Sequence, residues 1–208
     1  SVVAGDYDED GDLDLFVGGR CVPGLYPDLP HSFLLENRDG RFIDVTEKVA
    51  PDAREAGMVT SALFSDFSGD GRIDLVIAGH WSGLRFLEND GGSRFVDRSA
   101  TSGIVNESGW WHSLASGDFD NDGDIDYVAG NLGMNTRQTL QPTKEEPIRL
   151  YANDFDKNTS RDLLMTYYYN GTEFPARDRV AMASQMGTYT KRRFPTYTKY
   201  ATSPISKV

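Results

Sequence analysis

Four nine-residue stretches of the sequence place oxygen-bearing side chains at alternate positions. They span residues 6–14, 66–74, 118–126 and 154–162, and they hold 17 of the 32 acidic residues but only 3 of the 21 basic ones. In the first three, positions 1, 3, 5 and 9 carry Asp or Ser, and position 6 is Gly. Alternate oxygens on a tightly turned backbone converge on one hard cation, and Gly permits the turn. The spacing therefore predicts calcium-binding loops.

The predicted ligands occupy the odd positions of each loop. They are Asp6, Asp8, Asp10, Asp12 and Asp14 in the first loop; Asp66, Ser68, Asp70, Arg72 and Asp74 in the second; Asp118, Asp120, Asp122, Asp124 and Asp126 in the third; and Asp154, Asp156, Asn158, Ser160 and Asp162 in the fourth. At position 7 the backbone carbonyl is the expected ligand, so this side chain can vary, as it does at Asp12, Arg72, Asp124 and Ser160.

Two of the loops depart from the pattern. Ser68 at position 3 is expected to weaken binding in the second loop, and the fourth loop has Thr159 where Gly belongs. We therefore expect three to four bound Ca²⁺ ions, and whether the fourth loop is filled stays undecided. The alternative for any of these loops is a metal-free Asx-turn that joins two strands.

The EF-hand shares the beginning of this motif but not its end. It requires a bidentate Glu at position 12, between two helices. Position 12 is Val17, Ile77 and Ala129 in the first three loops. Each lies in a short apolar, partly β-branched run that closes with Gly, which is typical of a buried strand. The loops are therefore predicted to link strand to strand.

The rest of the chain repeats as well. After the first and second loops, residues 33–46 and 85–99 each read as strand, turn and strand, with Asp-Gly and Gly-Gly as hairpin signals. The loops begin 60, 52 and 36 residues apart. Four short strands in each unit of roughly 40–60 residues are typical of a β-propeller blade. The predicted fold class is therefore all-β, a β-propeller built of four-stranded blades.

These residues resemble a known family. An Asp-rich loop inside a four-stranded blade is similar to the FG-GAP or VCBS repeats of integrin α-chains, and most similar to bacterial relatives of cartilage acidic protein and the ASPIC/UnbV group. Supporting segments are residues 57–60, 109–112, 131–135 and 150–156. The resemblance implies a propeller, calcium at the loops and an extracellular or cell-envelope location.

The length predicts a partial propeller. At about 50 to 60 residues per blade, 208 residues provide three to four blades, whereas propellers close with at least four and those of the resembled family typically have about seven. We expect residues 1–175 to form the blades of a longer propeller. Residues 176–208 break the pattern: 180–186 has helix-forming composition and 191–200 is basic and aromatic, which predicts a helical insertion.

Composition and motifs exclude several functions. A net charge of −11 argues against a nucleic-acid partner, and no apolar run approaches the roughly 20 residues of a membrane span. The sequence has no nucleophile elbow, zinc-protease motif or phosphate-binding loop, so we expect no enzyme activity. His80, Trp81, Trp110, Trp111 and His112 occupy comparable places around their blades and are candidates for a rim that stacks on sugar rings. Simple packing of these aromatics between blades is the stronger alternative.

The function expected from these features is a calcium-stabilised propeller for adhesion or ligand binding. Filled loops remove the repulsion between carboxylates, and the blade faces bind a protein or glycan partner. Two alternatives remain open: the non-catalytic propeller part of a carbohydrate-active enzyme, and a structural spacer.

Overall fold

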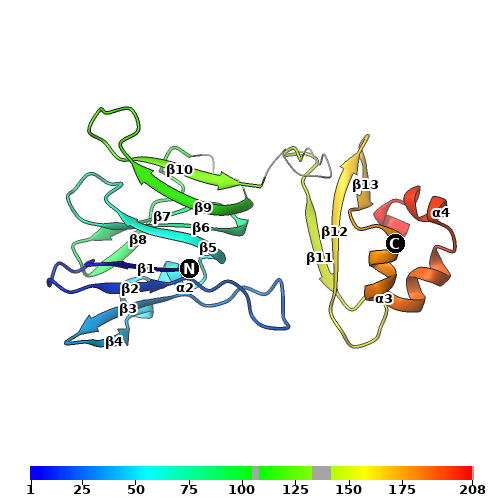
Figure 1. The fold of residues 1–208 in the computed structure, drawn as a ribbon, viewed down its shortest axis with the longest axis horizontal. Coiled ribbons are helices and arrows are strands. Elements are labelled where there is room, and N and C mark those ends of the chain that lie inside the picture. Colours follow the sequence, from blue (N-terminus) through cyan, green and yellow to red (C-terminus); the bar gives the residue numbers. More distant parts are fainter. Residues whose placement is uncertain (105–107, 133–141, 208) are drawn as a thin grey trace. The chain divides into compact units, whose positions relative to one another are not determined.

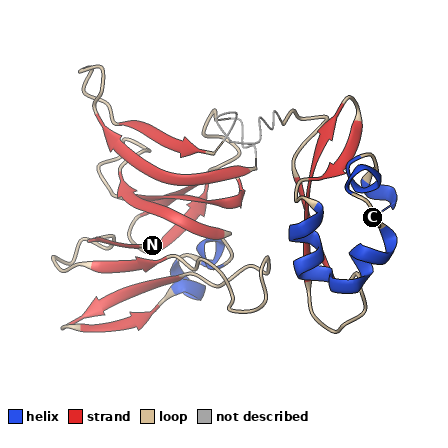
Figure 2. Ribbon diagram, turned by 45° about the vertical axis from the view of Figure 1, so that its right-hand side comes forward, coloured by secondary structure: helices blue, strands red, loops and turns tan. Residues whose placement is uncertain are grey.

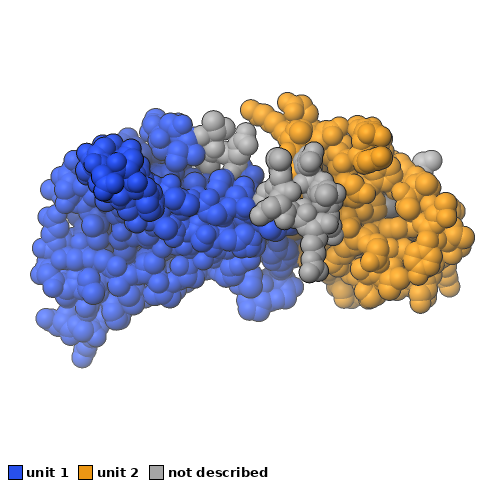
Figure 3. All heavy atoms as spheres, turned by 45° about the horizontal axis from the view of Figure 1, so that its top comes forward, with its two compact units in different colours: residues 1–132 blue, residues 133–208 orange. Residues whose placement is uncertain are grey.

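The computed structural model describes residues 1–104, 108–132 and 142–207. The chain divides into two compact units, residues 1–132 and 133–208, which Figure 3 colours separately. Of the segments that carry the family resemblance, residues 133–135 lie outside the described ones.

The first unit begins with a four-stranded antiparallel sheet. It runs β1 (Val2–Gly5), β2 (Asp14–Val17), β3 (Phe33–Arg38) and β4 (Arg41–Asp44) in sequence order (Figure 1). The β3–β4 turn holds Asp39 and Gly40 at φ 54° and 80°. Two successive residues at positive φ match the right-handed twist of a hairpin, so the hairpin predicted from Asp-Gly is confirmed.

Two short helices follow, α1 (Thr46–Val49) and α2 (Pro51–Arg54), which the sequence analysis did not predict. Val49, Ala50 and Ala53 are buried in the core beside the strands. Pro51 opens α2 at a position where its missing N–H costs no hydrogen bond.

A second sheet contains β5 (Met58–Ser65), β6 (Asp74–Ser82), β7 (Arg85–Asp90) and β8 (Arg94–Asp97), again antiparallel and paired in sequence order. It continues through β9 (Gly109–Gly117) to β10 (Asp126–Asn131), because the start of β9 pairs with the end of β6. Figure 2 shows these strands in red.

Strand β6 is buried on both faces. Leu75 and Ile77 belong to one apolar cluster, which also contains Phe16 of the first sheet. Val76 and Ala78 belong to a second cluster, against which residues of β9 and β10 pack. Because successive side chains of a strand point to opposite faces, this continuous apolar run requires a layer on each side. The prediction of a buried strand is confirmed after the second loop, whereas it is wrong after the third, because β10 contains no buried residue and Val128 is exposed.

The second unit contains a three-stranded sheet and the predicted helical segment. The strands are β11 (Arg149–Asn153), β12 (Asp162–Tyr169) and β13 (Thr172–Pro175), followed by α3 (Arg179–Arg193), α4 (Tyr197–Ala201) and the 3₁₀ helix η1 (Ile205–Lys207). Asp178 caps α3 by accepting hydrogen bonds from the backbone N–H groups of Val180 and Ala181. Leu164 of β12 packs with the buried helix residues Met182, Met186, Phe194 and Tyr200.

The described residues are thus mostly β, in antiparallel sheets, with two short helices in the first unit and a helical segment in the second. They form no closed propeller, and the number of blades stays a prediction. The boundary at residue 132 separates two compactly packed units. The boundary expected at residue 175 separates the repeats from the helical insertion, and it stays a prediction. Among the described residues, no helix has the length and apolarity needed to span a membrane.

Candidate metal centres

Each Asp-rich loop joins the first strand of its sheet segment to the second: β1 to β2, β5 to β6, β9 to β10 and β11 to β12. All four share one backbone geometry, with left-handed residues at positions 4 and 6. These are Glu9, Gly69, Asn121 and Lys157 at position 4, and Gly11, Gly71, Gly123 and Thr159 at position 6. The need for Gly at position 6 was predicted. The left-handed position 4 was not, since Glu and Lys give no signal of it.

Position 1 of each loop fixes the turn. The two carboxylate oxygens of Asp6 accept hydrogen bonds from the backbone N–H groups of Asp10 and Gly11, both at 3.1 Å. Asp66, Asp118 and Asp154 accept the corresponding pair in their loops. The loops therefore have the Asx-type bonds that the metal-free alternative requires, so the position-1 bonds do not by themselves distinguish the two hypotheses.

Position 9 ties each loop to its sheet. The carboxylates of Asp14, Asp74, Asp126 and Asp162 accept a hydrogen bond from the backbone N–H of position 2. Asp14 and Asp74 are fully buried and also accept from the third strand, through the N–H groups of Asn37 and Asn89 at 2.8 Å. Burial raises the pKa of Asp14 to about 6 and also raises that of Asp74. Position 9 thus has a structural role, and its role as a metal ligand stays a prediction.

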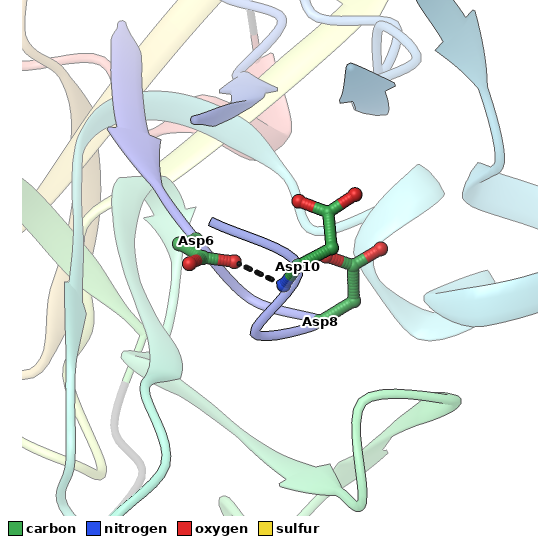
Figure 4. A group of neighbouring side chains, drawn as sticks. All are labelled: Asp6, Asp8 and Asp10. Atoms are coloured by element: carbon green, nitrogen blue, oxygen red, sulfur yellow. Dashed lines mark hydrogen bonds between the residues drawn. The ribbon is translucent and has the colours of Figure 1, made fainter. Parts of the chain in front are cut away.

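Three groups of carboxylates converge closely enough to hold a metal ion. Within each group the ligand atoms lie within 4.8 Å of one another; the groups are Asp6, Asp8 and Asp10; Asp118, Asp120 and Asp122; and Asp154, Asp156 and Asp162. Figure 4 shows the first group, with Asp8 and Asp10 on the same side of the loop and Asp6 facing the Asp10 backbone. The structure thus brings together positions 1, 3 and 5 of the first and third loops.

The first group also fits a cation chemically. Oδ1 of Asp8 is buried and has no hydrogen-bond donor among the residues that the structure describes, and the same is true of Oδ1 of Asp12. Burial, and then the charge of Asp10, raise the pKa of Asp8. A buried carboxylate oxygen without a donor is costly unless a cation neutralises it, and hard oxygen ligands suit Ca²⁺.

The second loop differs. Its acidic side chains form no such group among the described residues, because position 3 is Ser68. Instead, Arg72 lies 3.7 Å from the Asp70 carboxylate and 3.9 Å from that of Glu9 in the first loop. The guanidinium therefore supplies part of the positive charge between these two loops, although exposed pairs of this kind are weak.

A family model described as an FG-GAP-like repeat matches residues 66–129. The chain therefore contains a segment similar to an FG-GAP-like repeat. The matched segment begins at Asp66, the first residue of the second loop, and ends inside β10, so it contains both the second and third loops. The comparison with curated proteins gives no match. The likeness to cartilage acidic protein and the ASPIC/UnbV group stays an expectation.

Thr159 is the one β-branched residue among the left-handed loop positions, at φ 71°. A non-glycine residue in this region costs roughly 1–2 kcal/mol. Thr159→Gly is therefore expected to raise the free energy of unfolding of the second unit by about 1 kcal/mol, measured by urea denaturation. The matched change Gly123→Ala, at φ 97° in the third loop, is expected to destabilise the first unit. An unchanged or lower stability of Thr159→Gly would contradict the claim that the backbone at Thr159 is strained.

The predicted rim residues separate into two sets. Trp111 packs against the apolar cluster under β6, as the packing alternative holds. The other four gather where β6 ends and β9 begins: the His80 and His112 rings lie 4.5 Å apart, and those of Trp81 and Trp110 lie 5.1 Å apart. Two residues that the sequence analysis missed join them. We define the histidine–tryptophan cluster as Arg20, Tyr26, His80, Trp81, Trp110 and His112.

Hydrogen bonds connect this cluster. Arg20 Nη2 lies 2.9 Å from His80 Nδ1, and His80 Nε2 lies 3.3 Å from His112 Nδ1. Trp81 Nε1 donates to the Tyr26 hydroxyl at 2.6 Å. Burial, and then the charges of Arg20 and His112, lower the pKa of His80 to about 4. His80 is therefore neutral at pH 7.

A signal for Arg20 does exist in the repeat. Arg20 follows Asp6 by the same number of residues as His80 follows Asp66. Aligning the loops therefore places Arg20, which lies just after β2, at the position equivalent to His80 in β6. Tyr26 has no such counterpart, because the segment between β2 and β3 is longer than the one between β6 and β7.

Proposed function

We propose that this chain is a calcium-stabilised, β-propeller-type module of an extracellular or cell-envelope protein, and that it binds a protein or glycan ligand. The observation that carries the calcium part is the group of Asp6, Asp8 and Asp10, in which a buried carboxylate oxygen has no donor in the described part of the chain. The location and the adhesive role are supported by the FG-GAP repeat alone.

Positions 1, 3 and 5 of each loop, with the position 7 carbonyl, would hold the ion. Bound Ca²⁺ would supply the positive charge that closely spaced carboxylates need. The protein's own contribution is to pre-form the loop. The position 1 carboxylate closes the turn, and the position 9 carboxylate anchors it to the sheet. Because each loop joins two adjacent strands, a filled loop stabilises the start of its sheet.

No catalytic role is proposed for these carboxylates. Those at positions 1 and 9 accept backbone hydrogen bonds, as Asp6 and Asp14 illustrate. A general acid or base needs a carboxyl group that is free to exchange its proton with a substrate. The loops are better suited to structure than to chemistry.

Chelation is expected to lower the melting temperature strongly. With calcium at about 100 times its dissociation constant, one site adds roughly 2.7 kcal/mol to stability. Three loops lie in the first unit, so removal of calcium should lower its melting temperature by more than about 10 °C. Thermal melts in excess calcium and in EGTA, followed by tryptophan fluorescence, measure this. Equal melting temperatures would contradict the proposal.

A further inference from the structure

The histidine–tryptophan cluster lies far from the Asp-rich loops of its own sheet. His80 is six residues along β6 from Asp74, the last residue of the second loop. At about 3.3 Å per residue, the two are roughly 20 Å apart. The cluster is therefore separate from the candidate metal centres. Its residues come from the segment after β2, the end of β6 and the start of β9.

The hydrogen bonds fix the protonation of both imidazoles. A guanidinium donates and cannot accept, so Nδ1 of His80 must accept from Arg20. The proton of neutral His80 is then on Nε2, which donates to Nδ1 of His112. Neutral His112 in turn has its proton on Nε2. This relay leaves His112, an exposed residue, with an N–H to donate.

The cluster thus presents donors and no carboxylate. The exposed Arg20 guanidinium has five N–H groups, and one of them donates to His80. The Tyr26 hydroxyl accepts from Trp81, and its own hydrogen is left to donate. Nε1 of Trp110 is buried and has no acceptor among the described residues. A group of donors with a positive charge selects an acceptor-rich, anionic ligand.

A metal ion is the competing occupant. Two imidazole nitrogens at 3.3 Å match the separation of two ligands on a tetrahedral zinc ion with Zn–N bonds of about 2.0–2.1 Å. However, the Arg20 bond keeps the His80 proton on Nε2, which is the nitrogen a shared ion would need. The adjacent guanidinium also repels a cation. The arrangement therefore favours an anion over a metal.

The aromatic residues indicate what the anion is attached to. Trp81 and Trp110 are half-buried, so each leaves part of its indole surface accessible. Trp81 has φ 60°, a left-handed conformation that is a true outlier for a bulky residue and that concentrates at ligand sites. An indole offers an apolar face to the C–H groups of a sugar ring and a polar N–H to its hydroxyls.

We propose that the histidine–tryptophan cluster binds a carboxylate-bearing saccharide. Its carboxylate pairs with Arg20 and with the Nε2–H of His112, and its sugar ring lies against Trp81 and Trp110. This inference rests on the ligand-binding part of the proposed function and is independent of calcium binding at the loops.

Intrinsic fluorescence gives a local test. The chain has three tryptophans; two belong to the cluster and the third, Trp111, adjoins it in sequence. Titration of the full chain with aldotriouronic acid, in which glucuronic acid is linked to xylobiose, is expected to give a saturable change in tryptophan emission. Neutral xylotriose is expected to bind at least tenfold more weakly, because it cannot engage Arg20 and His112.

Variants make the test specific. Arg20→Gln and His112→Gln alter exposed side chains and are each expected to weaken binding of aldotriouronic acid at least tenfold. Arg94→Gln, which removes the same charge from an exposed position on β8, should leave the affinity unchanged. Circular dichroism of each variant verifies that it is folded.

Four results would overturn the inference: no saturable change, equal affinity for xylotriose, equal affinity for a triglutamate peptide, or an unchanged affinity in Arg20→Gln. Calcium binding, measured on the same samples, separates this failure from that of the calcium proposal. Saccharide binding without calcium binding would contradict only the proposal of calcium at the loops. Calcium binding without saccharide binding would contradict only the proposal of a saccharide at the cluster.

Discussion

Asp74→Ala is expected to lower the free energy of unfolding of the first unit by about 3 kcal/mol in chelator, and by at least as much in calcium. The Asp74 side chain is fully buried and accepts hydrogen bonds from the backbone N–H groups of Phe67, Ser68 and Asn89, at 2.8–3.0 Å. Its removal leaves three donors without this acceptor; the Asn89 N–H is buried, and a buried unsatisfied group costs roughly 1–3 kcal/mol. Urea denaturation followed by tryptophan fluorescence measures the loss.

Asp90→Ala is the matched control for this change. Asp90 is an exposed residue at the end of β7 in the same sheet, so its removal is expected to alter stability by less than about 0.5 kcal/mol. If Asp74→Ala were as mild as Asp90→Ala in chelator, position 9 would have no structural role, and the anchoring of loop to sheet would be wrong.

The effect of Asp10→Asn on the free energy of unfolding is expected to depend on calcium. The Asp10 side chain is exposed, and its Oδ1 accepts from the Asp12 backbone N–H, a bond that the Asn oxygen retains. The change therefore removes a charge and little else. In calcium it should remove most of the roughly 2.7 kcal/mol contributed by a filled loop. In EGTA it should be neutral or slightly stabilising, because one carboxylate fewer repels Asp6 and Asp8.

Asp122→Asn in the third loop is expected to behave in the same way, since Asp122 has the equivalent bond to the Asp124 N–H. Asp90→Asn supplies the control for the loss of one negative charge outside the loops. Thermal melts in calcium and in EGTA provide the comparison. Equal losses of stability in the two conditions would show that Asp10 stabilises the turn rather than an ion.

Much of this architecture was predictable because it depends on short-range patterns. The Gly at position 6 of the loops, the Asp-Gly hairpin after β3 and the apolar run of β6 each have a local cause: a left-handed φ, a turn geometry and burial on two faces. The Asp-capped helix after the fourth loop belongs to the same class, because Asp178 and the residues after it are contiguous in the chain.

What escaped prediction depends on packing between distant segments. The helices α1 and α2 are held by the burial of Val49, Ala50 and Ala53 against two sheets. Each helix has only four residues, which is too short for a helical period to show in the sequence. The contact of Arg20 with His80 joins residues 60 apart in sequence. Its only sequence signal is the equivalence of the two positions within the repeat.

The position 9 carboxylates show the same limit within the candidate site. Their spacing predicts a metal ligand, whereas the structure adds a second role that spacing does not reveal. Asp14 reaches Asn37 of β3, and Asp74 reaches Asn89 of β7. Both partners lie in the next strand of the sheet, so the hydrogen bond exists only once that strand has paired.

A calorimetric titration of the full chain with calcium tests the central claim most directly, with circular dichroism on the same sample to verify that it is folded. We predict three to four ions per chain, the weakest in the loops that contain Ser68 and Thr159, and the loss of one ion in Asp10→Asn. A folded chain that binds no calcium, or one whose stoichiometry is unchanged in Asp10→Asn, would contradict it and identify the loops as metal-free turns.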